Sequence, residues 1–127
     1  MTKIKILYVE DHPESRKSIQ QLLPVIFDCA VETANDGSKG IKKAINEDYS
    51  VIIMDIGLPD IDGIEAARRI REHKPNQVII SSSGHACLPE DTPADAFDAN
   101  FTKPFAAQLK EFGNFCQSKG IDLVELD

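Results

Sequence analysis

Residues Ile52–Gly63, which read IIMDIGLPDIDG, place an acid directly after an apolar run. With Val51, four apolar residues lead into Asp55, and two further acids, Asp60 and Asp62, follow in a short loop. An unbroken apolar run of this length is typical of a strand that is buried on both faces of a parallel sheet. The stretch therefore predicts a carboxylate at the carboxyl end of a buried strand.

The rest of the chain alternates between strand-like and helix-like spacing of its apolar residues. We expect strands at 3–9, 29–34, 51–54, 77–81 and 101–103, and helices at 14–23, 38–48, 64–72 and from 105 onward. Pro24 is expected to end or kink the first helix. Strands that alternate with helices in so short a chain predict βαβ crossovers and a parallel sheet covered on both faces.

Chemically distinctive side chains follow four of the expected strands. Glu10 and Asp11 follow the first, Asp55 ends the third, a serine run at 81–83 ends the fourth, and Lys103 ends the fifth. Ligands of open parallel sheets bind beyond the carboxyl ends of the strands. We therefore expect three carboxylates, a hydroxyl and an ammonium to meet at one edge of the sheet.

This combination of groups points to phosphoryl chemistry. Crowded carboxylates repel each other unless a cation joins them, and ligands that are all oxygen select a hard cation such as Mg²⁺. An ammonium and a hydroxyl suit the remaining oxygens of a phosphoryl group. A carboxylate can itself act as the nucleophile and form an aspartyl phosphate. The sequence thus predicts a site that phosphorylates its own aspartate.

Length and charge limit the alternatives. The 127 residues, of 14.0 kDa, predict a single domain over 1–127, and the net charge of −7 argues against nucleic acid or an anionic membrane as a direct partner. The chain has no apolar run long enough to cross a membrane, and charges interrupt its first residues, unlike a signal peptide. Three dispersed cysteines, Cys29, Cys87 and Cys116, indicate thiols in a reducing, cytoplasmic setting.

The segments ILYVEDH, IIMDIGLPDIDG, IISSSGHA and FTKPF, in this order and spacing, resemble the receiver domain of two-component response regulators. The resemblance covers residues 3–118 and leaves 119–127 as a tail. It implies a flavodoxin-like, doubly wound, five-stranded parallel sheet of strand order 2-1-3-4-5. It also implies a signalling domain, not a turnover enzyme. Such a domain takes a phosphoryl group from a histidine kinase or phosphotransfer protein and signals by contact with a downstream protein.

The same resemblance implies a role for each residue at the strand ends. Asp55 is the expected phosphoacceptor, Ser83 the switch hydroxyl, and Lys103 the cation that bridges to the phosphoryl group. The peptide bond between Lys103 and Pro104 is expected to be cis. The implied ligands of Mg²⁺ are Glu10, Asp11, Asp55 and the backbone carbonyl of Gly57.

Two departures from the family affect signalling. The position three residues before Lys103, which usually carries an aromatic or His ring that swings inward, is Asn100. Pro89 and Pro93 interrupt the segment before it, so we expect a late and shortened fourth helix. We therefore expect phosphorylation to reorder the loop at 84–95, with Asn100 staying in place.

Two other functions were weighed. A phosphatase that uses an aspartyl phosphate would need a second acid two residues after the nucleophile, where this chain has Gly57, and a cap domain for which there is no room. A pseudo-receiver would bind partners without phosphorylation, and the complete set of site residues argues against it.

The other polar residues near these motifs have simpler interpretations. Asp60 and Asp62 are expected to serve the loop and to cap helices. His12 and His85 are expected to be surface loop residues.

Overall fold

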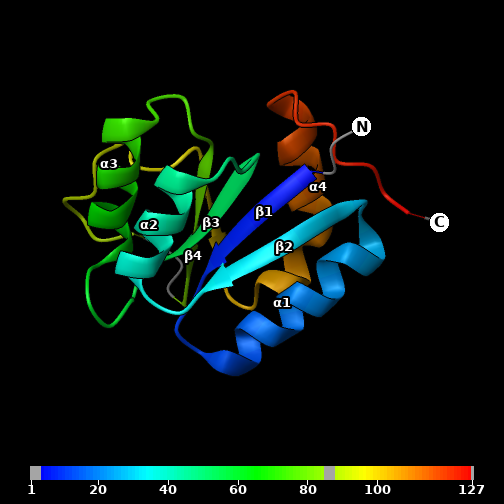
Figure 1. Ribbon diagram of the computed structural model, residues 1–127, viewed down its shortest axis with the longest axis horizontal. Helices are drawn as coiled ribbons and strands as arrows, with labels where there is room; N and C mark the ends of the chain where they lie inside the picture. The colour runs from blue at the N-terminus through cyan, green and yellow to red at the C-terminus, as the bar shows by residue number, and fades with distance from the viewer. Residues whose placement is uncertain (1–3, 85–87, 127) are drawn as a thin grey trace.

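The five strands form one parallel sheet in the computed structural model, which describes residues 4–84 and 88–126. Its order, β2-β1-β3-β4-β5, is the doubly wound order expected from the sequence (Figure 1). The strands are β1 Ile4–Val9, β2 Cys29–Ala34, β3 Val51–Asp55, β4 Ile79–Ser83 and β5 Ala99–Thr102.

The helices cover both faces of this sheet, as Figure 1 shows. One face packs against α1 and α4, and the opposite face against α2 and α3. Among the described residues, no helix is long and apolar enough to span a membrane. The helical segments are α1 Pro13–Ile26, α2 Gly37–Asn46, α3 Gly63–His73, the 3₁₀ turn η1 Phe105–Gln108 and α4 Leu109–Ser118.

The apolar run before Asp55 forms the centre of the molecule. Every residue of β3 is buried. Because side chains alternate along a strand, Ile53 packs on the side of α1 and α4, whereas Ile52 packs on the side of α2 and α3. Burying an aliphatic side chain of this size contributes about 1.5–3 kcal/mol. The two half-cores therefore fix the strand that presents Asp55.

The connection between β4 and β5 differs from the expectation. Residues 88–98 contain turns and no helix, so the predicted shortened fourth helix is wrong for this described segment. Pro89 and Pro93 explain the difference. They lie four residues apart, and each lacks the N–H that an α-helix would use at its position. Each proline carbonyl instead accepts a single turn-closing bond, from Thr92 at 3.0 Å and from Ala96 at 3.1 Å. His85 and Cys87 lie outside the described residues.

Arg71 of α3 holds this connection against the sheet. Its Nη1 donates to the carbonyls of Asp95 and Ala96 at 2.8 and 2.7 Å, and its Nη2 donates to Asp98 Oδ2 at 2.7 Å. The same Asp98 oxygen accepts the backbone N–H of Ile79 at 2.8 Å. Three apolar residues of the connection, Leu88, Ala96 and Phe97, pack on the side of α2 and α3. The hydrogen bonds of Arg71 and these apolar contacts therefore hold the connection against the sheet where no helix forms.

The first helix continues past Pro24 to Ile26. Its last bond runs from the N–H of Phe27 to the carbonyl of Leu23 at 2.8 Å, so Pro24 lies within the final turn. The expected end at residue 23 was therefore one turn short. Pro24 has no N–H to donate to the carbonyl of Gln20, but the following turn still closes on Leu23.

The C-terminal segment packs against the end of α1. Leu123 is 3% exposed and belongs to the core between the sheet, α1 and α4. The N–H of Asp28 donates to the carbonyl of Val124, and the N–H of Leu126 donates to the carbonyl of Ile26, each at 2.7 Å. The packed region therefore extends beyond the predicted limit at residue 118.

Candidate functional site

The three carboxylates expected from the sequence meet at the carboxyl edge of the sheet. Val9 of β1 pairs with Met54 of β3, so Glu10 follows the one strand where Asp55 ends the other. Glu10 is fully buried and Asp55 is 3% exposed. Asp11 lies at the rim with a partly exposed side chain. Glu10 and Asp55 therefore form a buried acidic pair, and Asp11 lies beside them at the solvent edge.

Lys103 joins this group from the end of β5. Its Nζ lies 2.8 Å from Glu10 Oε1 and 3.3 Å from Asp55 Oδ1. Its backbone N–H donates to the carbonyl of Ser83 at 2.8 Å, which ties the ends of β4 and β5 together. The cis peptide bond between Lys103 and Pro104 is confirmed.

The backbone around Asp55 is fixed by close packing. The N–H of Gly57 donates to Asp55 Oδ1 at 3.2 Å. Helix α3 starts directly against the strand end, where the N–H of Gly63 donates to the carbonyl of Ile56 at 3.0 Å. A Cβ on Gly63 would lie 2.3 Å from the carbonyl oxygen of Asp55, so only glycine permits this approach.

The buried acids do not share their charge equally. Burial, and then the neighbouring carboxylate of Glu10, raise the pKa of Asp55 to about 6. Burial acts in the same direction on Glu10, but the ammonium of Lys103 and the other hydrogen bonds outweigh it and lower the pKa of Glu10 to about 2. At neutral pH without a metal, Glu10 is the partner that Lys103 neutralises more fully, and Asp55 is the acid that is closest to protonation.

The serine run of β4 divides between three environments. Ser81 Oγ donates to Asn100 Oδ1 at 2.6 Å, and Ser83 is buried at the strand end. Asn100 itself is exposed, whereas Phe101 is buried on the side of α1 and α4, as its neighbouring strand position predicts. Ser82 pairs with Asp55 across the two strands. Its buried Oγ has no hydrogen-bond partner in the described part of the chain.

Two residues next to the acids were not singled out from the sequence. His12 was expected to be a plain surface residue, and its side chain is 69% exposed, yet its Nδ1 lies 3.2 Å from Glu10 Oε2 and 3.3 Å from Asp11 Oδ1. Arg16 Nη1 donates to the carbonyls of Glu10 and Asp11 at 2.9 and 2.8 Å. The first turn of α1 thus holds the loop that carries both acids.

The donor atoms at this edge fit a hard divalent cation. Ligand atoms of Glu10, Asp11 and His12 all lie within 4.8 Å of one another. Asp11 Oδ1 is enclosed and, among the described residues, accepts no hydrogen bond. The exposed ring of His12 lies 3.3 Å from this oxygen without a hydrogen bond to it, so a cation would give the enclosed carboxylate a stronger partner. Clustered carboxylate oxygens are the ligands that Mg²⁺ prefers.

The two remaining acids of the loop cap helices, as the sequence predicts. Asp62 Oδ1 accepts the N–H of Glu65 at 2.8 Å and is the N-cap of α3. Asp60 caps the neighbouring α2, where it accepts the N–H groups of Gly37 and Ser38 at 2.8 and 2.9 Å. These bonds direct both acids to helix N-termini, and they fix the loop that follows Asp55.

Comparison with known proteins agrees with this geometry. The family model for the response regulator receiver domain matches residues 6–109. The response regulator TrrA from Thermotoga maritima, solved in a complex with Mg²⁺-BeF, is 27% identical and superposes with a TM-score of 0.77 over 88% of this chain and 98% of TrrA. A complex of the histidine kinase ThkA with TrrA contains a chain that is 30% identical, with a TM-score of 0.75 over 87% of this chain and 96% of that one.

Curated relatives place similar segments in much longer proteins. A protein-glutamate methylesterase/protein-glutamine glutaminase of Carboxydothermus hydrogenoformans is 37% identical over 86 residues, which are 65% of this chain and 24% of the relative. Hybrid signal transduction histidine kinase G of Dictyostelium discoideum is 38% identical over 115 residues, which are 86% of this chain and 3% of the kinase. The chain thus spans a quarter or less of these relatives.

A doubly wound sheet with buried acids and a lysine at its carboxyl edge is the arrangement that the sequence motifs predict for a receiver domain. The family model, which matches residues 6–109, identifies the family. The chain belongs to the response regulator receiver domains of two-component systems.

Proposed function

We propose that Asp55 accepts the phosphoryl group in this receiver domain. The single observation that supports this most is the position of its carboxylate, buried at the end of β3 between the carboxylate of Glu10 and the ammonium of Lys103. Gly57 N–H and Lys103 hold Oδ1, which leaves Oδ2 as the nucleophile. The Oδ2–P bond forms as the bond between phosphorus and the nitrogen of the donor's phosphohistidine breaks, and the histidine nitrogen keeps the electron pair.

Glu10, Asp11, Asp55 and the carbonyl of Gly57 would hold Mg²⁺ at this edge, with Glu10 acting through water. The ion, when bound, supplies positive charge against the carboxylates and the phosphoryl oxygens. The enclosed Asp11 Oδ1 supports this ligand set. His12, which contacts both Glu10 and Asp11, positions the two acids from the solvent side.

Lys103 and Ser83 would donate hydrogen bonds to the phosphoryl oxygens that the ion does not bind. Lys103 contacts both buried acids, so it can stay on Glu10 while it donates to a phosphoryl group on Asp55. Ser83 takes the role of switch hydroxyl at the end of β4. Ser82 pairs with Asp55 across the strands, and its Oγ has no hydrogen-bond partner among the described residues, so it is a second hydroxyl available at the same strand end.

A histidine kinase or phosphotransfer protein is the proposed donor, and the proposed output is contact with a downstream protein. The complex of ThkA with TrrA supports the choice of donor. Residues 1–127 act as one receiver unit in this proposal, without turnover chemistry of their own. The proposed location is the cytoplasm, which rests on the dispersed cysteines of the sequence.

Incubation with Mg²⁺ and acetyl phosphate, followed by intact-mass spectrometry, tests the assignment. We expect the wild type to gain the mass of one phosphoryl group and Asp55→Asn to gain none, because the amide is no nucleophile for phosphorus. Asp62→Asn is the matched control, since asparagine caps α3 as well as aspartate does and leaves the site intact. Full phosphorylation of Asp55→Asn would remove Asp55 from this role, and loss of phosphorylation in Asp62→Asn alone would assign the phosphoryl group to Asp62 instead. Chelation of Mg²⁺ should abolish the gain in mass.

A further inference from the structure

A groove of about 530 Å³ lies between α1 and α2, beside the carboxyl half of β2. Figure 1 shows β2 at the edge of the sheet, between α1 and α2. The groove shares Arg16 with the site around Asp55, since that side chain also holds the loop of Glu10 and Asp11. Four of the side chains that line it are cationic and one is acidic, namely Arg16, Lys39, Lys42 and Lys43 against Glu47.

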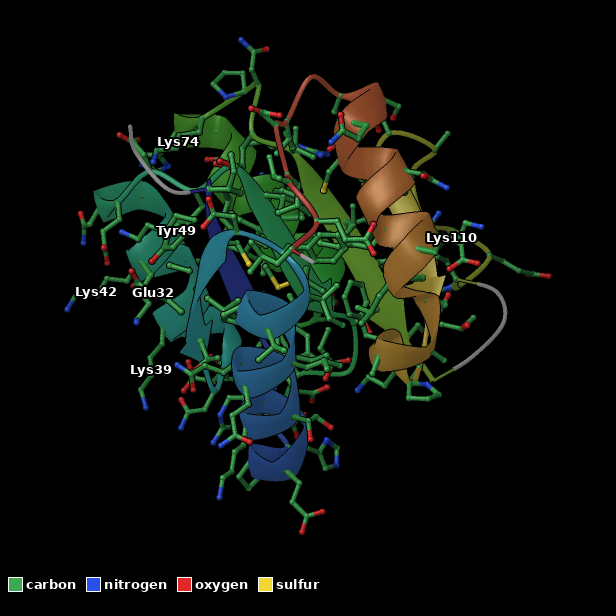
Figure 2. The ribbon with its side chains drawn as sticks, turned by 90° about the vertical axis from the view of Figure 1, so that its right-hand side faces the viewer. Glu32, Lys39, Lys42, Tyr49, Lys74 and Lys110 are labelled. Atoms are coloured by element: carbon green, nitrogen blue, oxygen red, sulfur yellow. The ribbon has the colours of Figure 1, made fainter. Side chains whose placement is uncertain are left out.

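This concentration of positive charge is unusual for a chain of net charge −7. Lys42 has no ion-pair partner among the residues that the structure describes. Lys39 and Lys43 have only loose partners, Asp36 at 3.9 Å and Glu32 at 3.6 Å. Figure 2 shows Lys39 and Lys42 pointing outward from α2 on the side of Glu32.

Lys5 of β1 pairs with two acids beside the groove. Lys5 Nζ lies 2.7 Å from Glu47 Oε1 and 3.1 Å from Glu32 Oε2. Tyr49 also donates to Glu32, at 2.9 Å. Lys5 offsets only one of these two charges, so five cations (Lys5 and the four that line the groove) face three carboxylates (Glu32, Asp36 and Glu47). The groove therefore has a surplus of positive charge.

The floor of the groove offers backbone groups as well. Strand β2 is an edge strand, and the carbonyl of Ala34 faces β1, where it accepts the N–H of Glu10 at 3.0 Å. The carbonyl of Val31 faces the other way and accepts from Gln20 at 3.4 Å. Backbone groups alternate in direction along a strand, so Thr33 presents its N–H and C=O away from β1, into the groove.

We propose that this groove binds an extended acidic segment of a partner protein, whose carboxylates meet Arg16 and the lysines of α2 while its backbone pairs with the outer edge of β2 at Thr33. Strand addition at a sheet edge supplies backbone bonds, and the flanking charges select the sequence. A long polyanion such as nucleic acid or an anionic membrane is disfavoured, because the rest of this acidic molecule repels it. A short acidic segment matches the local charge and avoids that repulsion.

Fluorescence anisotropy with a labelled synthetic peptide, in which glutamate alternates with threonine, tests the charge requirement. We expect saturable binding that weakens with added salt, and no binding of the peptide in which glutamine replaces glutamate. The double variant Lys39→Gln/Lys42→Gln should bind about fivefold more weakly, as expected for two exposed charge contacts. The matched control is Lys110→Gln/Lys119→Gln on and after α4, where Lys110 lies on the opposite side of the view in Figure 2.

Three outcomes would overturn the proposal. One is no binding of the acidic peptide by the wild type, and another is equal loss in the two double variants. The third is tighter binding of a single-stranded oligonucleotide or of phosphatidylserine vesicles, lost with Lys39 and Lys42, since it would assign the groove to another class of partner.

Amide exchange tests the pairing with β2 separately. The N–H of Thr33 should exchange more slowly when the acidic peptide is bound, whereas binding without added protection at Thr33 would overturn strand addition. The Asp55→Asn variant should bind the peptide as the wild type does, so this test stands apart from that of the phosphoacceptor.

Discussion

Burial and a neighbouring acid make the ionised form of Asp55 unfavourable in the metal-free protein, and its elevated pKa expresses this. Burial is the largest of these effects, and Glu10 adds to it. Lys103 offsets part of the cost, although it contacts Glu10 at the shorter distance. The site is therefore built to accept positive charge from outside or to lose negative charge. This is the electrostatic state that a magnesium-dependent phosphoacceptor requires.

The stability of the metal-free protein should report this cost directly. A carboxyl group whose pKa is raised in the folded state stabilises the fold at low pH, and this contribution is lost as the pH rises through about 6. Asp55→Asn removes the charge, so we expect it to raise the free energy of unfolding by about 1–3 kcal/mol at pH values above 6. The difference from the wild type should shrink towards zero as the pH falls below the ordinary pKa of aspartate.

Urea unfolding in the presence of a chelator, at a series of pH values, measures this difference. Asp62→Asn controls for the change from acid to amide in the same loop, since Asp62 is exposed and caps α3. A stability gain in Asp55→Asn that does not vary with pH would show that the charge of Asp55 is not its origin.

The site could be predicted from the sequence to the extent that strand ends determine it. Asp55, Glu10 and Lys103 follow apolar runs, and the parallel topology then brings them together. The contact of His12 with both acids depends on the path of the loop into α1, which no periodic pattern encodes. Its position directly after Glu10 and Asp11 was the only signal for it in the sequence.

The helices and strands could likewise be predicted where the sequence pattern is local. Those with strong periodicity, such as β3 and α3, were predicted to within two residues. The connection between β4 and β5 was not, because the prolines indicated only what could not form there. Arg71, on a helix well before the connection, supplies the bonds that hold it, and a contact between segments so far apart is invisible to local pattern.

Arg71 should control the order of this connection. In Arg71→Gln, we expect faster amide exchange in residues 88–98 and a loss of about 1–2 kcal/mol in the free energy of unfolding, because several charge-assisted hydrogen bonds disappear. Arg69→Gln is the matched control on the same helix, since Arg69 is exposed and its Nε donates to Glu65 at 2.9 Å within that helix. Exchange that changes equally in both variants would show that Arg71 is not the anchor.

The molecule as a whole has two unequal faces around the site. On the side of α1 and α4, the rings of Phe101, Phe105 and Phe112 pack edge to face, with centroids 5.1–6.4 Å apart. On the other side, the connection of turns at 88–98 relies on Arg71 and a few apolar contacts, and its Pro89 and Thr92 line a pocket together with Ile56, the residue after Asp55. We therefore expect a change at the site to spread into this connection.

Beryllofluoride, a mimic of the phosphoryl group, should reorder the loop at 84–95 and leave Asn100 in place. Asn100 is exposed and already accepts a hydrogen bond from the buried Ser81, and burial of its amide without a partner would cost about 1–3 kcal/mol. Amide-exchange maps with and without the mimic measure this response. Asp55→Asn, which should not bind the mimic, provides the baseline. Changes centred on Asn100, with the loop unaltered, would contradict this mechanism.

The C-terminal segment gives the chain a directional weakness under tension. Residues around Glu125 run antiparallel to the end of α1 at Phe27, so a force applied to the last residues loads their hydrogen bonds one after another. The five parallel strands are joined side by side along their whole length, and pulling along them would shear many bonds at once. A load on the C-terminus would therefore peel away the segment that carries Leu123 while the sheet, and the acids at its edge, still hold.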